Sequence, residues 1–460
     1  MSVAAEMRRG WCPSVARPMP TGDGLLVRLS LPADSLPPAL LHAIASCARR
    51  FGNGLVDLTR RGNLQLRGLS EATMPGLIEA LSSFEGVASP HEAESLRDVM
   101  MSPLSGLDPK AICDVRPIVR ALREKLAGEA SLRALPAKFC FTVDDGGDFG
   151  LDQIAADVRF KARRESSDIF FMVALGGCEG EARGVGGCAP SSVPEIAVAL
   201  ARTFLNLRGA SDDAPRRMAD LLKRTETETL SRSVGLLSLF SHRSDIVEGV
   251  ASPGLREPGP PITMIYSREE GPASIGIAVP FGQLTADQLD DIANQTEAFG
   301  GEVRLTPWRT IFVANRSAIN ALNMDYRLEN SGLITSEPDP RLNIAACPGK
   351  PACARSTVLT RENARMLGSV AQGLRLSSPG GVIGLHVSGC AKGCARSTVT
   401  KATLVGRNGR YDLVINGVAS DPPARQSLTL EEAKIALEQI VEAMWAEHGE
   451  LLEEAFRKSQ

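Results

Sequence analysis

The sequence predicts an α+β fold in which one module of strands and helices occurs twice. Phe51–Thr59 and Phe299–Thr306 align when one residue is deleted, and they share Phe-Gly, Gly, Val, Leu and Thr. The predicted strands and helices around the two segments also follow the same order. A duplication explains the shared residues and the shared order together, whereas chance matches between short apolar segments explain only the residues.

Each copy begins with a strand, a helix and a second strand. In the earlier copy we expect a strand at Leu25–Leu29, a helix at Pro37–Arg50 and a strand at Leu64–Leu66. In the later copy we expect a strand at Ile275–Val279, a helix beginning at Thr285 and a strand at Ile311–Val313. Gln288 completes a capping box with Thr285, and a glycine after each helix permits the positive φ common at helix ends.

A second unit follows in each copy. Met101–Gly106 corresponds to Ala346–Pro351, and the expected strand Phe139–Val143 corresponds to Leu385–Cys390, each leading into a Gly-rich loop. Helices are expected at Val193–Leu207 and at Leu430–Glu447, the latter capped by Thr429 and Glu432. Arg407–Arg410 is typical of a hairpin turn, and Ser252–Pro261 of a linker between the two halves.

Length and composition limit the class of protein. A chain of 460 residues usually forms two or three domains, and a net charge of −3 gives no general field for nucleic acid. The N-terminus lacks the apolar stretch of a signal peptide, and no apolar run is long enough to span a bilayer. We therefore expect a cytoplasmic protein whose ten cysteines are reduced and serve as metal ligands or buried apolar side chains.

Four of these cysteines form two spaced pairs among glycines and prolines. Five residues separate Cys347 from Cys353, and three separate Cys390 from Cys394. Four thiolates are the ligand set of a [4Fe–4S] cluster, and glycine and proline let the backbone wrap tightly around it. Zinc favours two-residue spacings, and structural cysteines would not gather in this way. We interpret Cys12, Cys47, Cys113, Cys178 and Cys188 as structural.

The two cysteine pairs within a duplicated chain resemble the sirohaem-dependent sulfite and nitrite reductase family, over about Gly24–Trp445. The resemblance implies two ferredoxin-like half-domains paired into one domain, with two α/β cluster-type domains beside it. The corresponding segments are residues 1–80, 81–245, 262–330 and 335–460, and the last would hold the [4Fe–4S] cluster. It also implies that Cys394 bridges the cluster to the sirohaem iron where sirohaem is present.

Within that family, the segments His386–Ala395 and Leu58–Gly68 look most like those of the oxygen-dependent members that act in aerobic cobalamin biosynthesis. This resemblance implies a monooxygenase that hydroxylates the tetrapyrrole precorrin-3A with γ-lactone formation. It further implies a mononuclear non-haem iron, whose ligands the sequence does not place, and NADH as the ultimate electron donor. Because no Gly-x-Gly-x-x-Gly opens a helix after a strand, we expect the electrons to arrive through a separate reductase.

Basic residues are the candidates for binding the carboxylates of a tetrapyrrole. Arg60 and Arg61 form a double charge in one copy only, since Pro307 and Trp308, followed by a single Arg309, occupy the corresponding positions in the other; Arg67 closes the same segment as Arg60 and Arg61. A solvated hairpin with surface arginines is the alternative interpretation. Arg355, Arg396, Lys350 and Lys392 surround the cysteines, and we expect them to support the cluster; the repeated Cys-Ala-Arg-Ser suggests a helix after each cysteine.

Two further candidates rest on the resemblance. Arg97 and Lys138 resemble family residues that hold the small anion, although ordinary surface charge explains them equally well. Ala137 replaces the arginine of that family motif and Cys140 its second lysine, which argues against sulfite reduction. His386 precedes Cys390 in the same strand, and a buried, hydrogen-bonded core histidine is the favoured interpretation.

Two other functions remain open. The first is a sirohaem-dependent sulfite or nitrite reductase, which a Soret band would reveal. The second is a non-catalytic iron–sulfur carrier or scaffold, which would have no affinity for a tetrapyrrole.

Overall fold

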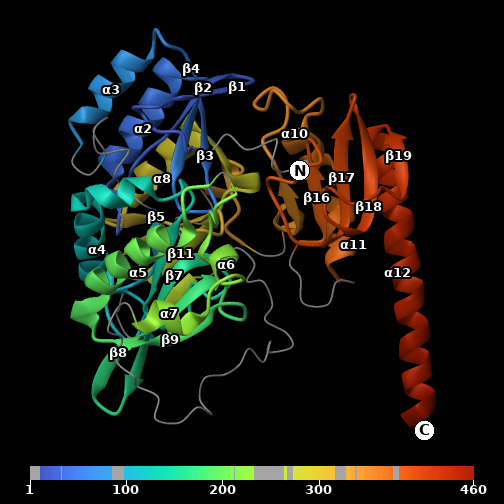
Figure 1. Cartoon of the computed structure of the whole chain (residues 1–460). Coiled ribbons are helices and arrows are strands. Elements are labelled where there is room, and N and C mark those ends of the chain that lie inside the picture. The colour runs from blue at the N-terminus through green and yellow to red at the C-terminus, as the bar shows by residue number, and fades with distance from the viewer. Residues whose placement is uncertain are drawn as a thin grey trace.

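Four sheets, each covered by helices, make up the molecule in the computed structural model (Figure 1). The structure describes residues 11–32, 34–84, 87, 98–211, 213–232, 264–266, 273–315, 328–336, 339–376 and 383–459. The expected linker Ser252–Pro261 and Arg97 lie outside these residues. No helix among the described residues is both long and apolar enough to cross a lipid bilayer.

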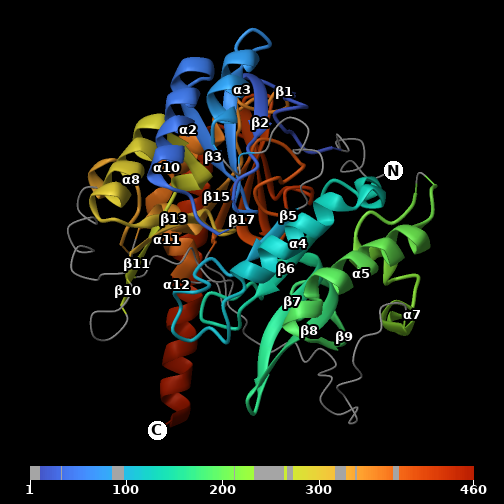
Figure 2. The ribbon, with the colours of Figure 1, turned by 90° about the vertical axis from the view of Figure 1, so that its left-hand side faces the viewer.

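The two ferredoxin-like half-domains form one body with a shared core. The first sheet has the order β1 (Met19–Thr21), β2 (Gly24–Arg28), β4 (Leu64–Leu69), β3 (Leu55–Leu58) and β12 (Gln283–Thr285). The second has the order β10 (Met264–Tyr266), β11 (Ala273–Ala278), β14 (Thr310–Asn315) and β13 (Glu302–Leu305). The helices α2 (Pro38–Phe51), α3 (Met74–Ser82) and α8 (Ala286–Ala298) cover them, and α2 packs against α8 (Figure 2).

The halves are joined by a reciprocal exchange of strand pairing. Leu284, just before α8, pairs with Val56 of the first half, and Leu36, just before α2, pairs with Val303 of the second. Leu36 and Leu284 occupy equivalent positions in the two halves, and so do Val56 and Val303. Each half therefore makes the same pairing with the other, as a two-fold relation between duplicated units requires. One apolar core extends from Val27 and Leu41 in the first half to Ile277 and Leu289 in the second, which confirms the expected pairing of the half-domains.

The two remaining sheets share one topology. The first contains β5 (Asp98–Met101), β6 (Cys140–Asp144), β7 (Ala156–Glu165), β8 (Asp168–Gly177) and β9 (Arg183–Cys188). The second contains β15 (Ile344–Ala346), β16 (Leu385–Ser388), β17 (Thr400–Arg407), β18 (Arg410–Gly417) and β19 (Arg425–Leu428). In both, the first three strands are parallel and the last two pairings are antiparallel.

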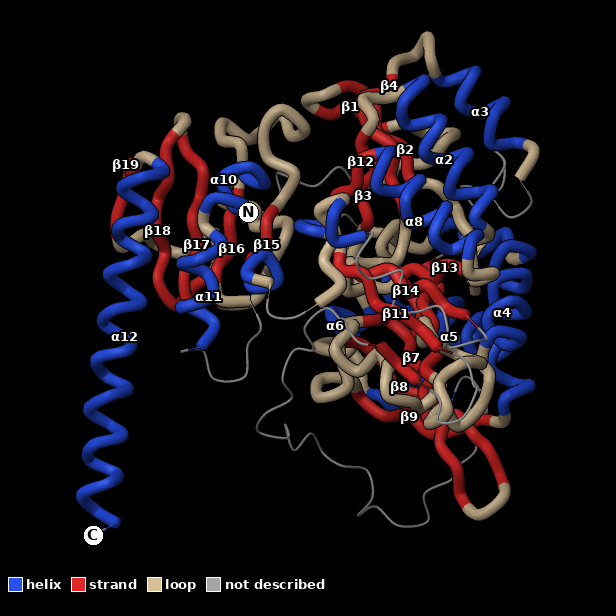
Figure 3. Tube along the Cα trace, turned by 180° about the vertical axis from the view of Figure 1, so that it is seen from behind, coloured by secondary structure: helices blue, strands red, loops and turns tan. Residues whose placement is uncertain are grey.

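Helices of these two domains occupy matching places in the chain. The first domain has α4 (Arg116–Gly128), α5 (Val193–Arg208), α6 (Met218–Leu221) and α7 (Thr227–Arg232). The second has α10 (Thr360–Met366), α11 (Gly368–Leu376) and α12 (Leu430–Ser459). Seen from behind, α12 runs along its sheet and continues beyond it, away from the other domains (Figure 3).

Most local expectations are confirmed, and two are wrong. Gly52, at the end of α2, has a φ of −116° in place of the expected positive value. Both bonds of the capping box at Thr285 form, and Asn408 and Gly409 take the positive φ of a hairpin turn. However, no helix opens directly after Cys353 or Cys394, because each is followed by turns. The four segment boundaries remain a proposal, since β12 of the third segment joins the sheet of the first.

The duplication extends to single hydrogen bonds in the cluster-type domains. The amide of Gly389 donates to Cys347 Sγ at 3.1 Å, and the amide of Asp145 donates to Ser102 Oγ at 3.0 Å. Ser102 therefore occupies in the first copy the place of Cys347 in the second. Asp145 is fully buried, and its Oδ2 has no hydrogen-bond partner among the described residues. Burial and the nearby Asp144 and Asp108 raise the pKa of Asp145 to about 6, although hydrogen bonds with Gly147 and Ser102 act in the opposite direction.

Replacing Asp145 by Asn should stabilise the protein more at pH 8 than at pH 5. The folded state binds the Asp145 proton more tightly than the unfolded chain does, since its pKa lies about 6 against an ordinary 3.8. Stability from this group is therefore present below pH 3.8 and is lost as the pH rises through 6. The gain at pH 8 should reach up to about 3 kcal/mol, measured as the free energy of unfolding in urea.

The control is Asp148→Asn, because Asp148 is exposed and pairs with Lys110 at the surface. An equal effect of Asp145→Asn at both pH values would contradict the raised pKa.

Candidate metal centre and adjoining cavities

Two parallel strands place the first cysteine of each pair at one sheet edge. Cys347 follows β15 and Cys390 follows β16, and these strands pair in parallel with Ala346 opposite Val387. The carboxyl ends of parallel neighbours meet at the same edge, so the residues that follow them emerge side by side. The amide of Cys347 also donates to the carbonyl of Val387 at 3.3 Å, which holds the two loops together.

Gly389 permits the close approach of the two loops. A Cβ at this position would lie 2.4 Å from Ser356 Oγ and 3.5 Å from Cys347 Sγ, so no side chain fits. The bare backbone lets the Gly389 amide reach the Cys347 sulfur. An amide aimed at a ligand sulfur stabilises the electron-rich state of a metal centre.

The second cysteine of each pair completes a group of four. Loss of hydration raises the pKa of the Cys394 thiol, Lys392 opposes this, and the nearby Cys347, Cys390 and Cys353 raise it further. The four sulfur atoms are thus close enough to interact electrostatically. Cys347 is buried whereas Cys394 is the exposed member, so the group is open toward solvent on the Cys394 side.

The four cysteines supply the ligand set of a [4Fe–4S] cluster. Among the described residues, no group of three or more His, Cys, Asp or Glu side chains is placed to hold one metal ion. Zinc requires sulfurs about 2.3 Å from one centre, whereas a cubane spreads its four thiolates over four irons. Four thiolates with glycines between them therefore fit the ligand set of a [4Fe–4S] cluster.

A buried ionic network fastens the first half-domain to the Cys353 loop. The Arg67 guanidinium bonds Asp23 at 2.9 Å, Asp57 at 3.1 Å and the carbonyl of Ala352 at 2.7 Å. Arg361 bonds the other oxygen of Asp57 at 2.8 Å. Although burial opposes it, Arg67 holds the pKa of the Asp23 carboxyl below its usual value. Arg67 is only 3% exposed, so its charge is already matched by protein carboxylates.

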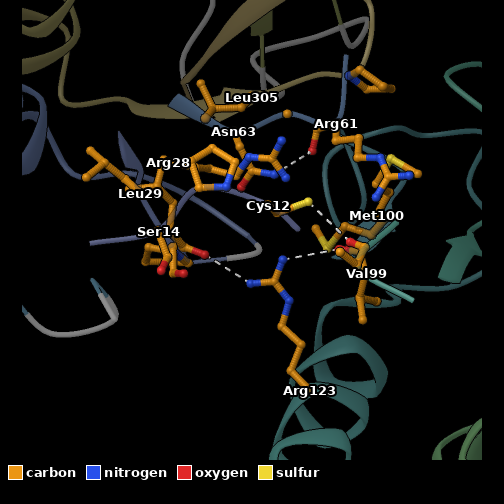
Figure 4. Close-up of a pocket in the computed structure, with 18 of the residues that line it drawn as sticks. Cys12, Ser14, Arg28, Leu29, Arg61, Asn63, Val99, Met100, Arg123 and Leu305 are labelled. Atoms are coloured by element: carbon orange, nitrogen blue, oxygen red, sulfur yellow. Dashed lines mark hydrogen bonds between the residues drawn. The ribbon is translucent and has the colours of Figure 1, made fainter. Parts of the chain in front are cut away.

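A cavity of about 650 Å³ lies between the first half-domain and the first cluster-type domain. Eight arginines and one acidic residue, Asp34, line it. In Figure 4, Arg28 and Arg61 enter from one wall and Arg123 rises from α4 on another. A volume within the usual range for small-molecule sites, with this excess of positive charge, suits a large polycarboxylate.

One corner of this cavity reaches the cysteine loops. Arg61 donates to the carbonyl of Lys138 at 2.8 Å. Desolvation lowers the pKa of Lys138, and Arg61, Lys392 and Arg217 lower it further. Lys392 belongs to the Cys390–Cys394 loop, so cations from three parts of the chain converge there. Arg217 also lies 3.7 Å from the Cys140 sulfur and therefore places a cation beside the position of the missing lysine.

A second cavity of about 140 Å³ adjoins the cysteine loops directly. Arg60, Arg309, Arg341 and Arg396 line it, with no carboxylate among its described lining residues. Pro307 lines both cavities, which therefore lie side by side. Arg60 donates to the carbonyl of Ala395, next to Cys394, at 3.3 Å.

The structure brings some expected site residues together and assigns others elsewhere. Arg60, Arg61 and Lys138 face the two cavities or their shared corner, whereas Arg67 is committed to the buried network. His386 is buried as expected, yet neither ring nitrogen has a hydrogen-bond partner among the described residues, contrary to the expected bonded histidine. Burial, Arg396 and Arg309 together lower the pKa of His386 to about 4.

Sequence reasoning missed several cationic residues of the cavities. Arg123, Arg208 and Arg216 lie on or beside helices, where an isolated arginine carries no pattern that distinguishes it from a solvated one. Arg309 did have a signal, because it is the only arginine at the later copy of the Arg60–Arg61 loop.

Comparison with protein-family models places most of the chain in one group. Residues 17–84 and 266–329 match the nitrite/sulfite reductase ferredoxin-like half domain. Residues 92–238 match the nitrite and sulphite reductase 4Fe-4S domain. The second match covers the first copy of the cluster-type domain, whereas the four cysteines lie in the second copy.

Individual relatives agree with these matches. The chain is 36% identical to precorrin-3B synthase of Sinorhizobium sp over 91% of this chain and 85% of that protein. It is 25% identical to ferredoxin–nitrite reductase of Synechococcus elongatus over 88% of this chain and 81% of that protein. The Mycobacterium tuberculosis NirA structure matches 91% of this chain and 80% of its own length, with a TM-score of 0.71 and 19% identity, which shows the shared fold.

Replacing Arg67 by Ala should lower the free energy of unfolding by about 3 to 5 kcal/mol, because it leaves Asp23 and Asp57 buried with less compensation. Urea titration followed by circular dichroism measures the change. Arg202→Ala is the control, since Arg202 and Glu129 form an exposed pair and its loss should cost no more than about 1 kcal/mol. Equal losses in the two variants would contradict a special role for the buried network.

Proposed function

Because the chain belongs to the nitrite and sulfite reductase family, we propose that it catalyses the precorrin-3B synthase reaction on precorrin-3A. The 36% identity to a precorrin-3B synthase over 91% of the chain supports this choice. Within the structure, one observation carries the proposal. A cavity lined by eight arginines and one aspartate reaches the group of four cysteines through Arg61, Lys138 and Lys392.

The proposed cofactor is one [4Fe–4S] cluster on Cys347, Cys353, Cys390 and Cys394. When bound, such a cluster accepts and passes on single electrons. Cys347 and Gly389 form the buried side of this site, and Cys394 faces the substrate side. Arg67 and Arg361 hold the loops in place, so the protein prepares the site before the substrate binds.

The substrate's carboxylates would be held by the cavity arginines. Arg61 and Lys138 stand at the corner nearest the cysteines, so they would fix which part of the macrocycle faces the redox centre. Arg60 would act from the adjoining cavity, where it contacts the loop after Cys394. Arg67 would support the loops instead of the substrate, because two aspartates already occupy its guanidinium.

The proposed reaction is a monooxygenation. One atom of O2 enters the macrocycle, which forms a hydroxyl group and a γ-lactone, and the other leaves as water. The two electrons required would come from NADH through a separate reductase. Triplet O2 needs a metal to react with a closed-shell substrate, and we propose a mononuclear iron in addition to the cluster. Its ligands are not assigned, because no described group of three metal-binding side chains is placed to hold one ion.

The test of this function is a reconstituted reaction. Anaerobically purified protein, precorrin-3A and a reductant are mixed, O2 is admitted, and the product is analysed by mass spectrometry with labelled O2. The expected product carries one labelled oxygen atom. Consumption of nitrite or sulfite without oxygen transfer would instead support a sirohaem-dependent reductase. A stoichiometric Soret band of sirohaem in the purified protein would support the same alternative. Failure to bind any tetrapyrrole would support a carrier or scaffold.

Cys353→Ala should abolish the broad visible absorption of the cluster and the activity together, since three thiolates cannot complete the ligand set. Iron and sulfide content and the absorption spectrum of anaerobic protein measure the outcome. Cys178→Ala is the matched control, because Cys178 lies outside the group of four and should keep both properties. Wild-type iron content in Cys353→Ala would refute the ligand assignment.

Arg61→Ala should weaken binding of precorrin-3A by about 10- to 100-fold, the effect of one lost charge-assisted bond. An anaerobic binding titration measures it. Arg163→Ala removes a partly exposed guanidinium from β7, where Arg163 pairs with Glu179, and should leave the affinity unchanged. If both variants bind precorrin-3A with wild-type affinity, the substrate does not contact the part of the cavity that contains Arg61.

A further inference from the structure

The loops that precede β4 and β14 have the same backbone structure in the two half-domains. Thr59 Oγ1 accepts hydrogen bonds from the amides of Arg61 and Asn63. Thr306 Oγ1 accepts them in the same way from the amides of Trp308 and Thr310. The third residue after each threonine takes a left-handed conformation, with φ of 63° at Gly62 and 60° at Arg309.

Arg309 therefore occupies a position that favours glycine. A non-glycine residue in this conformation is strained, and such strain persists where the surrounding structure or a function retains it. The fold also makes room for the arginine. A Cβ on residue 282 would lie 2.8 Å from Arg309 Cδ. The glycine at this position therefore leaves space for the Arg309 side chain. The first copy shows that the loop itself needs no arginine.

The strained loop carries the Arg309 guanidinium to the cysteine loops. Arg309 lines the smaller cavity together with Ala345 and Ala395, which lie two residues before Cys347 and one after Cys394. Its Nε has no hydrogen-bond partner among the described residues. Loss of hydration, Arg361 and Arg60 together lower the pKa of Arg309 to about 10, although Asp57 and Cys347 act in the opposite direction. Even at that value the guanidinium remains charged at neutral pH.

We propose that Arg309 sets the reduction potential of the cluster by placing a positive charge beside its Cys347 side. This inference rests on the cluster assignment in the proposed function. Reduction adds one electron from the external donor to the cluster and makes it more negative, with no bond formed or broken in the protein. A nearby cation in a poorly hydrated site stabilises that reduced state and raises the potential. Arg309 would thus influence the reaction only through the cluster, as a positioning residue that does not touch the substrate.

The experiment compares midpoint potentials of the cluster in the full-length, cluster-loaded protein without precorrin-3A. Arg309→Gly removes the charge and restores the residue that the first copy uses, and Arg309→Asn removes the charge with a side chain that tolerates positive φ. Both should shift the midpoint potential to more negative values, while Arg309→Lys should stay near the wild type. The melting temperature of Arg309→Gly should not fall, because glycine relieves the strain.

Arg410→Gln is the charge-matched control, since it removes one exposed guanidinium from the β17–β18 hairpin and should leave the potential unchanged. An unchanged potential in Arg309→Gly and Arg309→Asn, with iron content intact, would overturn the inference. So would loss of the cluster from both neutral variants but not from Arg309→Lys, because the charge would then serve assembly. Absence of a cluster from the wild type would refute the proposed function instead.

Discussion

The pairing of β15 with β16 is the constraint on which the metal centre depends. Because these strands are parallel neighbours, the chain leaves both of them at one edge, and Cys347 and Cys390 start their loops side by side. The contact between the Gly389 amide and the Cys347 sulfur is possible only without a side chain at position 389. The remaining two cysteines complete the group because short turns from Gly349 to Cys353 and from Cys390 to Gly393 return the chain to it.

The two copies of the half-domain and of the cluster-type domain share one backbone structure, and they differ at single residues. Ser102 stands where Cys347 stands in the other copy, and it accepts the equivalent hydrogen bond without offering a thiolate. Asp57 on β3 binds Arg67 and Arg361 near the cysteine loops. Arg304, its counterpart on β13, instead bonds Glu302 and the carbonyls of Pro103 and Ser105. Each half-domain is thus fastened to a different cluster-type domain by a buried ionic group of opposite sign.

The cationic residues around the cavities fall into two kinds. Arg67 is neutralised by buried aspartates and stabilises the architecture, so its charge is unavailable to a ligand. The larger cavity is lined by eight arginines and one aspartate, and although Arg304 among them bonds Glu302, the lining keeps an excess of positive charge. A lining with this excess of positive charge suits a polycarboxylate ligand. Arg309 belongs to this second kind but is directed toward the cysteine loops.

The sequence alone determined the elements, the duplication and the four cysteines. These features depend on local periodicity, on capping residues such as Thr285 and Gln288, and on spacing, all of which lie within short stretches of chain. The tertiary structure decided the roles of the arginines. Arg60, Arg61 and Arg67 share one hairpin, yet they face two cavities and a buried ion network, because strand alternation and distant partners such as Asp23 determine where each side chain points. Arg217 reaches Cys140 from 77 residues away, and no pattern in the sequence connects the two.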